Sequence, residues 1–83
     1  MPKIRIIFEQ KHILPYLEAR GLVKQYIKAR RFLLMGNMAA IFFKERNPKN
    51  FGVWQFRINK QFRALGAFDT NGRLTIFEID NHQ

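Results

Sequence analysis

Arginine and lysine side chains are the residues of this chain whose type and spacing point most directly to chemistry. Eleven of the fifteen basic residues fall between Arg20 and Arg63, and Glu45 is the only acid in that stretch. The stretch ends on the run FRINKQFRALGAF, in which Arg57 and Arg63 flank a short turn. Clustered cations attract phosphate, and an arginine fork fits two phosphate oxygens at once. The sequence therefore predicts a polyanionic partner rather than a merely solvated basic surface, whose self-repulsion would cost a small domain stability.

Length and composition indicate one small domain over residues 1–83. The 83 residues carry a net charge of +9, and hydrophobic residues make up 47% of them, which is enough for a core. The absence of cysteine excludes disulfides and thiolate metal sites and favours a cytoplasmic setting. The longest apolar run, Met38 to Phe43, is too short for a membrane span, so we expect no membrane partner.

The two histidines do not form a recognisable site together. His12 and His82 are far apart in sequence and lack nearby acids, and there is no glycine-rich phosphate loop, nucleophile elbow or pair of carboxylates. We therefore expect no metal and no cofactor. His82 can gain or lose a proton near neutral pH, which makes it a candidate acid or base, although a histidine in this position is often simply exposed.

Hydrophobic periodicity predicts a strand and two helices in the first half of the chain. Residues 3–9 alternate at period two, with Ile4, Ile6 and Phe8 on one face. The helices cover about 11–20 and 22–35, and Gly21 and Gly36 fit their ends. On the second helix one side holds Val23, Tyr26, Ile27, Leu33 and Leu34, and the other holds Lys24, Lys28 and Arg31.

In the second half of the chain, the residue pattern predicts a series of strands separated by turns. Residues 38–46 fit either a strand or a connector, and a loop follows around Pro48. Three segments rich in aromatic or β-branched residues predict a three-strand meander over 52–58, 62–69 and 73–80. These elements predict an α+β fold, in which the N-terminal strand and the meander form a small antiparallel sheet packed on the two N-terminal helices.

Turn residues predict how the meander strands pair. Asn71-Gly72 is typical of a two-residue type I′ turn, which pairs Phe68 with Thr75, Gly66 with Phe77, and Ala64 with Ile79. In the preceding hairpin, a three-residue loop over 59–61 pairs Ile58 with Phe62, Arg57 with Arg63, Phe56 with Ala64, and Trp54 with Gly66. One face is then apolar and suited to cover by the helices: Trp54, Phe56, Ile58, Phe62, Ala64, Gly66, Phe68, Phe77 and Ile79. We interpret these aromatics as core rather than as a base-stacking platform.

The opposite face of the meander is partly polar and is where a site is expected. It holds Gln55, Arg57, Arg63, Leu65, Ala67, Ile76, Glu78 and Asp80. The register sets Arg63 across from Asp80, so we expect Arg63 to pair with Asp80 or Glu78 and to have a structural role. Arg57 faces no acid in this pairing, which makes it the better candidate for a phosphate contact.

The order of the elements, the run FGVWQFRINKQFRALGAFD and the closing FEIDNHQ resemble the RelE/ParE superfamily of toxins from bacterial toxin–antitoxin pairs. The resemblance covers most of the chain. Its motifs are an aromatic-x-x-Arg strand, a tight turn, an aromatic-Arg start to the next strand, and a last strand ending near a histidine. Here they correspond to Trp54 with Arg57, Phe62 with Arg63, and His82. Catalytic members usually carry a further Arg or Tyr after the last strand, and this sequence has neither.

In the RelE branch the resemblance implies ribosome-dependent cleavage of messenger RNA, by attack of a 2′-hydroxyl on the adjacent phosphate. Such chemistry needs a base for the hydroxyl proton and cations for the charge on the phosphate. Arg57 matches the strand arginine and is the candidate phosphate stabiliser, with Lys44, Arg46 and His82 as the further catalytic candidates. The candidates for holding the RNA backbone are Lys49, Lys60, Arg63, Lys28 and Arg31.

The resemblance leaves other activities open. A ParE-like toxin directed against DNA gyrase, or a catalytically weak member that binds antitoxin and nucleic acid, would need no cleavage chemistry. Each of these implies a cognate antitoxin whose acidic, partly disordered segment folds on the basic toxin surface. The expected partners are therefore an acidic antitoxin and messenger RNA on the ribosome, with DNA gyrase as the alternative target.

Overall fold

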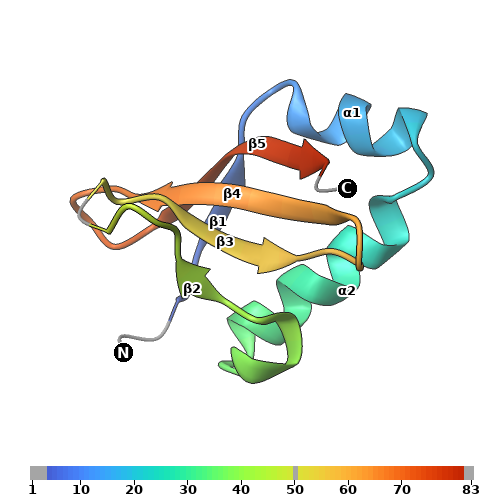
Figure 1. The fold of residues 1–83 in the computed structure, drawn as a ribbon. Coiled ribbons are helices and arrows are strands. Elements are labelled where there is room, and N and C mark those ends of the chain that lie inside the picture. The colour runs from blue at the N-terminus through green and yellow to red at the C-terminus, as the bar shows by residue number, and fades with distance from the viewer. Residues whose placement is uncertain (1–3, 50, 82–83) are drawn as a thin grey trace.

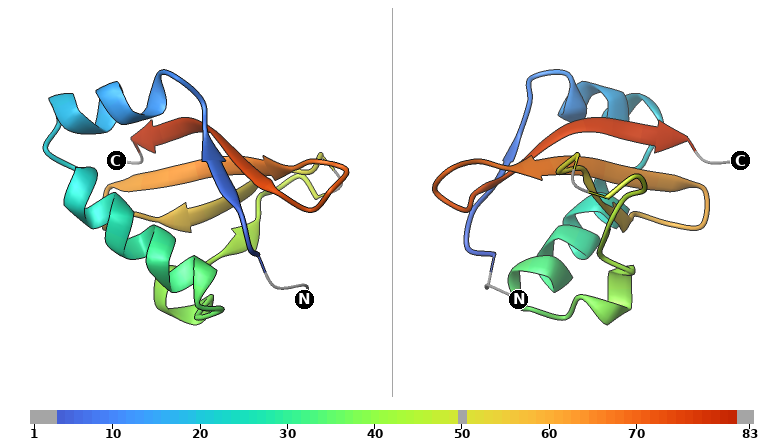
Figure 2. Two further views of the ribbon diagram at one scale, coloured as in Figure 1. Left: turned by 180° about the vertical axis from the view of Figure 1, so that it is seen from behind. Right: turned by 60° about the vertical axis from the view of Figure 1, so that its left-hand side comes forward.

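A computed structural model describes residues 4–49 and 51–81 and shows an α+β fold with a five-stranded mixed sheet (Figure 1). Its elements in chain order are β1 (Ile7–Glu9), α1 (Ile13–Ala19), α2 (Val23–Leu34), the 3₁₀ helix η1 (Ala39–Ile41), β2 (Lys44–Glu45), β3 (Trp54–Arg57), β4 (Phe62–Phe68) and β5 (Leu74–Asn81). The strand order is β1-β5-β4-β3-β2. Seen from behind, α2 crosses one face of the sheet, while the opposite face of β3 and β4 has no helix over it (Figure 2).

None of the helices in the described ranges is both long and apolar enough to cross a membrane.

The sheet is not the wholly antiparallel one that the sequence predicted. β1 pairs parallel with β5, where the Leu74 amide donates to the Ile6 carbonyl (3.1 Å) and the Gln10 amide to the Ile76 carbonyl (3.0 Å). Parallel pairing requires a long connection, and the two helices and the first strands of the meander provide it. Residues 38–46 hold both η1 and the short strand β2, which pairs with β3 and extends the sheet at that edge.

The buried residues of the N-terminal segment also differ from the predicted alternation. Ile7 is buried, whereas Ile6 and Phe8 are 47% and 46% exposed. Ile4 is buried as predicted, but it lies before the start of β1, so period two does not extend over 3–9. The strand itself is only three residues long, which is too short for alternation to identify its inner face.

The glycines predicted at the helix ends are confirmed there. After α1, the Leu22 amide donates to the Leu17 carbonyl (2.9 Å) and the Gly21 amide to the Glu18 carbonyl (3.2 Å), with Gly21 at φ 66°. This pair of bonds is a Schellman motif, which needs a left-handed residue after the helix. Gly36, at φ 82°, ends α2 in the same way.

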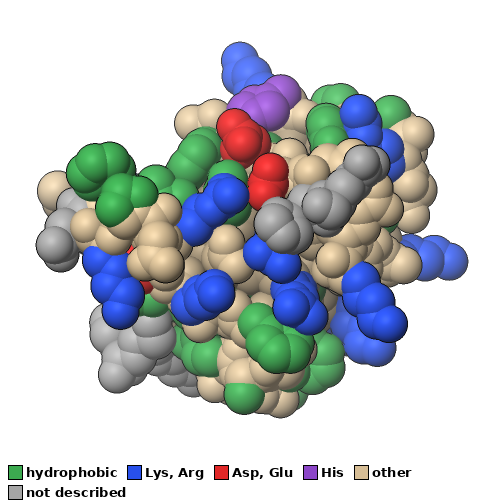
Figure 3. All heavy atoms as spheres, in the orientation of Figure 1, with side chains coloured by type: hydrophobic (Ala, Val, Ile, Leu, Met, Phe, Trp, Pro, Cys, Tyr) green, Lys and Arg blue, Asp and Glu red, His purple; other side chains and the backbone are tan. Residues whose placement is uncertain are grey.

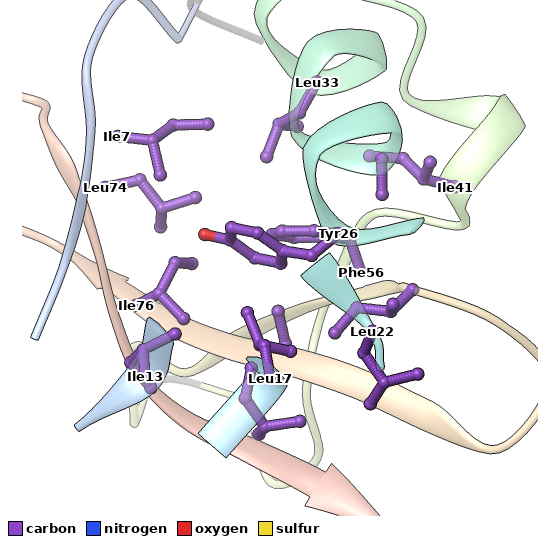
Figure 4. Close-up of a cluster of buried hydrophobic side chains, with 14 of the residues drawn as sticks. Ile7, Ile13, Leu17, Leu22, Tyr26, Leu33, Ile41, Phe56, Leu74 and Ile76 are labelled. Atoms are coloured by element: carbon purple, nitrogen blue, oxygen red, sulfur yellow. The ribbon is translucent and has the colours of Figure 1, made fainter. Parts of the chain in front are cut away.

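The core lies between α1, α2 and the inner face of the sheet (Figure 4). The buried residues of α2 are Tyr26, Ala29 and Leu33, and the Tyr26 ring stacks on Phe56 with centroids 6.1 Å apart. Ile27, which the amphipathic pattern placed on the apolar side, is 47% exposed, because the helix is rotated to direct Tyr26 and Ala29 at the sheet.

A polar network ties α2 to β1 at the edge of this core. The Tyr26 hydroxyl donates to Glu9 Oε2 (2.6 Å), and Arg30 Nε donates to the same oxygen (2.8 Å). Arg30 Nη2 also donates to the Ile7 carbonyl (2.8 Å). Burial, followed by the bond to the Glu9 carboxylate and its charge, raises the pKa of Tyr26 well above its usual range, so the hydroxyl remains a donor.

The register predicted for the first hairpin of the meander is confirmed. Trp54 pairs with Gly66, Phe56 with Ala64, and Arg57 with Arg63. Large residues face small ones across this hairpin, as predicted, with Trp54 opposite Gly66 and Phe56 opposite Ala64. On the other side of β4, a Cβ at Gly66 would lie within 3.0 Å of the Thr75 carbonyl oxygen and the Leu74 and Ile76 side chains of β5, so a larger residue there would require β5 to shift.

The two-residue turn predicted for the second hairpin is wrong. The Asp69 amide donates to the Arg73 carbonyl (2.9 Å), which leaves a three-residue loop over 70–72 with Gly72 at φ 77°. Asp69 Oδ1 accepts bonds from the amides of Asn71 and Arg73, both at 2.9 Å. These bonds, that from the Arg73 amide first, hold the pKa of Asp69 below its usual value. The side chain of Asp69 therefore favours the longer loop.

A bulge in β5 then restores the predicted pairing at the far end of the hairpin. Near the loop Phe68 pairs with Leu74 and Gly66 with Ile76, one residue away from the prediction. The register shifts between Leu65 and Gly66, after which Ala64 pairs with Ile79 and Arg63 with Asp80 as predicted. The shift places Ile76 in the core and moves Phe77 to the open face, the reverse of the expected assignment.

Candidate nucleic-acid interface

Basic side chains gather on the sheet face that no helix covers. Figure 3 looks onto this face and shows Lys and Arg side chains spread over β2, β3 and β4, with acidic side chains nearer to β5. Two hollows lie on this face, with volumes of about 600 and 200 Å³, and a third of about 390 Å³ lies at its edge, between α2 and the end of β3. The basic residues that line them are Lys28, Lys44, Arg46, Lys49, Arg57, Lys60 and Arg63.

The three hollows adjoin one another and form a basic furrow, defined by these seven residues. The largest hollow and the smallest share Lys44, Gln55 and Arg63. The smallest also shares Phe42 and Arg57 with the third, which reaches α2. The furrow thus follows β2 and β3 from the 46–49 loop to the helix side of the molecule, a shape that suits an extended anionic chain.

Arg57 and Arg63 lie at the middle of the furrow and face each other across β3 and β4. Like charges in directly opposed sheet positions repel, so this pairing costs the free protein stability and an anion between the two would relieve it. Neither arginine forms an ion pair with an acid in the parts of the chain that the structure describes. Among the described residues, no acid competes with a phosphate for either charge.

The guanidinium of Arg57 rests on an aromatic ring instead of a carboxylate. Its Cζ lies 4.2 Å from the centre of the Phe42 ring, within the range of a cation–π contact. Phe42 itself has φ 53° and ψ 44°, the one left-handed non-glycine residue in the described ranges, and it is 56% exposed. A bulky residue in this conformation carries about 1–3 kcal/mol of strain, which the surrounding structure must sustain. Phe42 directly follows η1, and its ring lies under the Arg57 guanidinium where two hollows meet.

Arg63 does not form the ion pair with Asp80 that its register position suggested. The Arg63 Nε is buried and has no hydrogen-bond partner among the described residues. Asp80 Oδ2 is instead contacted by Arg46 Nη2 at 3.4 Å, because the loop after β2 returns over the open face of the sheet. This is a correction of the predicted division of roles: Arg46 pairs with Asp80, and Arg63 has no acid partner among the described residues.

Seven of the nine candidate residues from the sequence line the furrow. Arg57, Lys44, Arg46, Lys49, Lys60, Arg63 and Lys28 are all brought together there. Arg31 lies on the exposed side of α2 and lines none of the three hollows. His82 lies outside the described residues.

Beside the basic residues, the hollows are lined by Phe42, which the sequence analysis did not name, and by Glu45, Trp54 and Gln55, which it named but did not propose as site residues. Trp54 stacks on Phe43 with ring centroids 5.1 Å apart, at the edge of the core rather than inside it. The consecutive pair Phe42-Phe43 was the available signal, because adjacent residues cannot both face one core and one of the two rings had to be exposed.

Within the described ranges there is no group of three or more His, Cys, Asp or Glu residues placed to hold a metal ion. The furrow is instead a set of fixed cations and hydrogen-bond donors. A comparison with models of known protein families found no match, and a comparison with curated proteins found none either.

Proposed function

We propose that this protein is a toxin of the RelE/ParE superfamily that cleaves messenger RNA on the ribosome. The opposed pair Arg57 and Arg63, without acid partners in the described ranges, carries this proposal. Two guanidinium groups across adjacent strands are suited to the oxygens of one phosphate and to the charge that develops when a 2′-hydroxyl attacks it. The motif resemblance and the furrow agree on the same arginine.

The remaining furrow residues receive roles from their positions. Lys44 lines the hollow that also holds Arg57 and Arg63, so it would share the phosphate charge. Lys49 at one end and Lys28 and Lys60 at the other would follow the RNA backbone. Glu45 is the acid that lines the largest hollow, and with His82 it is a candidate to accept the hydroxyl proton. An acidic antitoxin segment would bind the same cations and block them.

A second candidate is a toxin that binds nucleic acid or DNA gyrase without cleaving. The observation in its favour is that no His or Tyr lines the furrow in the described part of the chain. Such a protein would need a positively charged surface but no side chain placed to donate or accept a proton in catalysis.

Mapping the 5′ ends of messenger RNA after induction in growing cells separates the two candidates. We expect new ends within translated regions for the unmodified protein, and Arg57→Ala should reduce them by at least about 100-fold, as loss of one charge-stabilising donor typically does. Growth arrest should be lost in parallel.

The matched control for that experiment is Arg20→Ala. Arg20 is the exposed residue directly after α1, and its contacts are with Tyr16, so this change removes the same charge outside the furrow. Growth arrest without new RNA ends, or an Arg57→Ala variant that still arrests growth, would exclude the nuclease and favour the second candidate.

A further inference from the structure

An apolar pocket of about 250 Å³ lies on the open face beside the furrow. The loop between β2 and β3 and the outer face of the sheet together form its wall, which includes Pro48, Phe51, Val53, Leu65 and Phe77. Figure 3 shows hydrophobic side chains over this loop, next to basic ones. Arg46 and Asn47 line both this pocket and the largest furrow hollow, so the two spaces adjoin.

Phe51 is the unusual member of this pocket because it is 77% exposed, more than any other large hydrophobic residue in the described ranges. A phenylalanine in this position contributes little to the core, yet it lines the pocket. Phe77 has been turned toward the same side by the bulge in β5. The pocket therefore offers aromatic surface next to the furrow cations, since Arg46 lines both.

Aromatic surface next to cations is the arrangement with which proteins hold single-stranded nucleic acid. Each unpaired nucleotide carries a charged phosphate on one side of the sugar and a flat base on the other, and bases stack on aromatic side chains. Arg46 lies on the shared boundary, and because its contact with Asp80 Oδ2 is long at 3.4 Å, it can also contact the phosphate. The Asn47 side chain can bond to a base edge. An acidic protein segment would match the cations but would not need an open ring face.

We infer that this pocket is a nucleobase subsite, in which a base of single-stranded RNA stacks on Phe51 while its phosphate lies on Arg46 in the furrow. The inference rests on the proposed function in taking RNA as the polyanion, but it does not require cleavage. It assigns the β2–β3 loop a part in RNA recognition: Phe51 and Phe77 contact the base, and the furrow cations hold the chain.

The test uses short oligonucleotides with 2′-O-methyl sugars, which cannot be cleaved, each with one 2-aminopurine base. We expect the fluorescence of 2-aminopurine to be quenched on binding, because stacking quenches it. Phe51→Ala should abolish the quenching and weaken binding by roughly 5-fold to 100-fold, as loss of one stacked base does. Phe51→Trp should retain both signals. Because Phe51 is exposed, its replacement should leave the thermal midpoint unchanged.

Ile27→Ala is the matched control, since Ile27 is an exposed apolar residue of α2 outside the pocket, and it should bind like the unmodified protein. An oligonucleotide with abasic sites should bind the unmodified protein and Phe51→Ala equally. Equal binding of the base-containing oligonucleotide would overturn the inference, as would a Phe51→Ala variant that loses affinity only for an acidic peptide. Quenching by a protein that cleaves no RNA would reject the nuclease proposal and support the subsite.

Discussion

Arginine side chains on the two sides of the sheet differ in whether the fold supplies them with hydrogen-bond acceptors. On the helix side, Arg30 bonds to Glu9 and to the Ile7 carbonyl, and the Tyr26 hydroxyl completes the network. On the open side, Arg57 has an aromatic ring as its contact and Arg63 has a buried Nε without a partner among the described residues. The first cluster satisfies its charge within the fold, and the second leaves its charge for a ligand.

This difference indicates which basic residues stabilise the protein and which reduce its stability. The Glu9 carboxylate of β1 accepts hydrogen bonds from Tyr26 and Arg30 of α2 at the boundary of the core. These bonds tie together two elements that otherwise have few contacts with each other. The furrow places seven cations around a shallow surface, where their mutual repulsion opposes folding. Substitutions in the two clusters should therefore separate stability from nucleic-acid binding.

Glu9→Ala should have the largest effect on stability. It leaves the buried Tyr26 hydroxyl without its acceptor and Arg30 without its acid, and we expect a loss of roughly 1–3 kcal/mol in the free energy of unfolding, measured by urea denaturation. Glu9→Gln, which keeps an oxygen for Tyr26, should lose less. RNA affinity at a temperature where both variants are folded should stay within a few-fold of the original. A loss of RNA affinity well beyond a few-fold would show that the clusters are not independent.

The hairpins show how far sequence reasoning could go with the fold. The register of β3 with β4 was predictable because the three-residue loop and the opposition of Trp54 to Gly66 are local features. The register of β4 with β5 depended on a loop one residue longer than Asn71-Gly72 suggested and on a bulge that shifts it back. The two deviations cancel, so the pairing of Arg63 with Asp80 was correct although the steps leading to it were not.

The sequence predicted which basic residues form the site, but not which of them pairs with an acid. Charge alone pointed to the furrow cations, which are seven of the eleven basic residues between Arg20 and Arg63. The partner of Asp80 depended on the return of the loop after β2 over the open face, a long-range event with no local signal. The left-handed conformation of Phe42 is likewise imposed by the tertiary structure and not by residue preference.

Phe42→Leu should have an intermediate effect and should act on the open side only. Removing the ring takes away the support of the Arg57 guanidinium, and since a cation–π contact at an exposed site is worth about 0.5–1 kcal/mol, we expect RNA cleavage to fall about two-fold to five-fold. Phe42→Tyr keeps the ring and should restore activity. The Arg57 Nε–H proton should lose its ring-current shift in the leucine variant, measured by NMR. A cleavage defect without that spectral change would mean that Phe42 contacts RNA directly and does not position Arg57.

Asp80→Asn should have the smallest effect and should act in the opposite direction. The Arg46–Asp80 pair is long at 3.4 Å, and its side chains are 37% and 26% exposed, so stability should change by less than about 1 kcal/mol. Removing the carboxylate frees Arg46 for phosphate, and RNA affinity at about 0.1 M salt should rise a few-fold, with a steeper salt dependence. Glu78→Gln removes the same charge from an exposed position of β5 that lines none of the furrow hollows. Equal gains from the two variants would attribute the effect to net charge, whereas a gain confined to Asp80→Asn would show that Asp80 restrains one cation of the furrow.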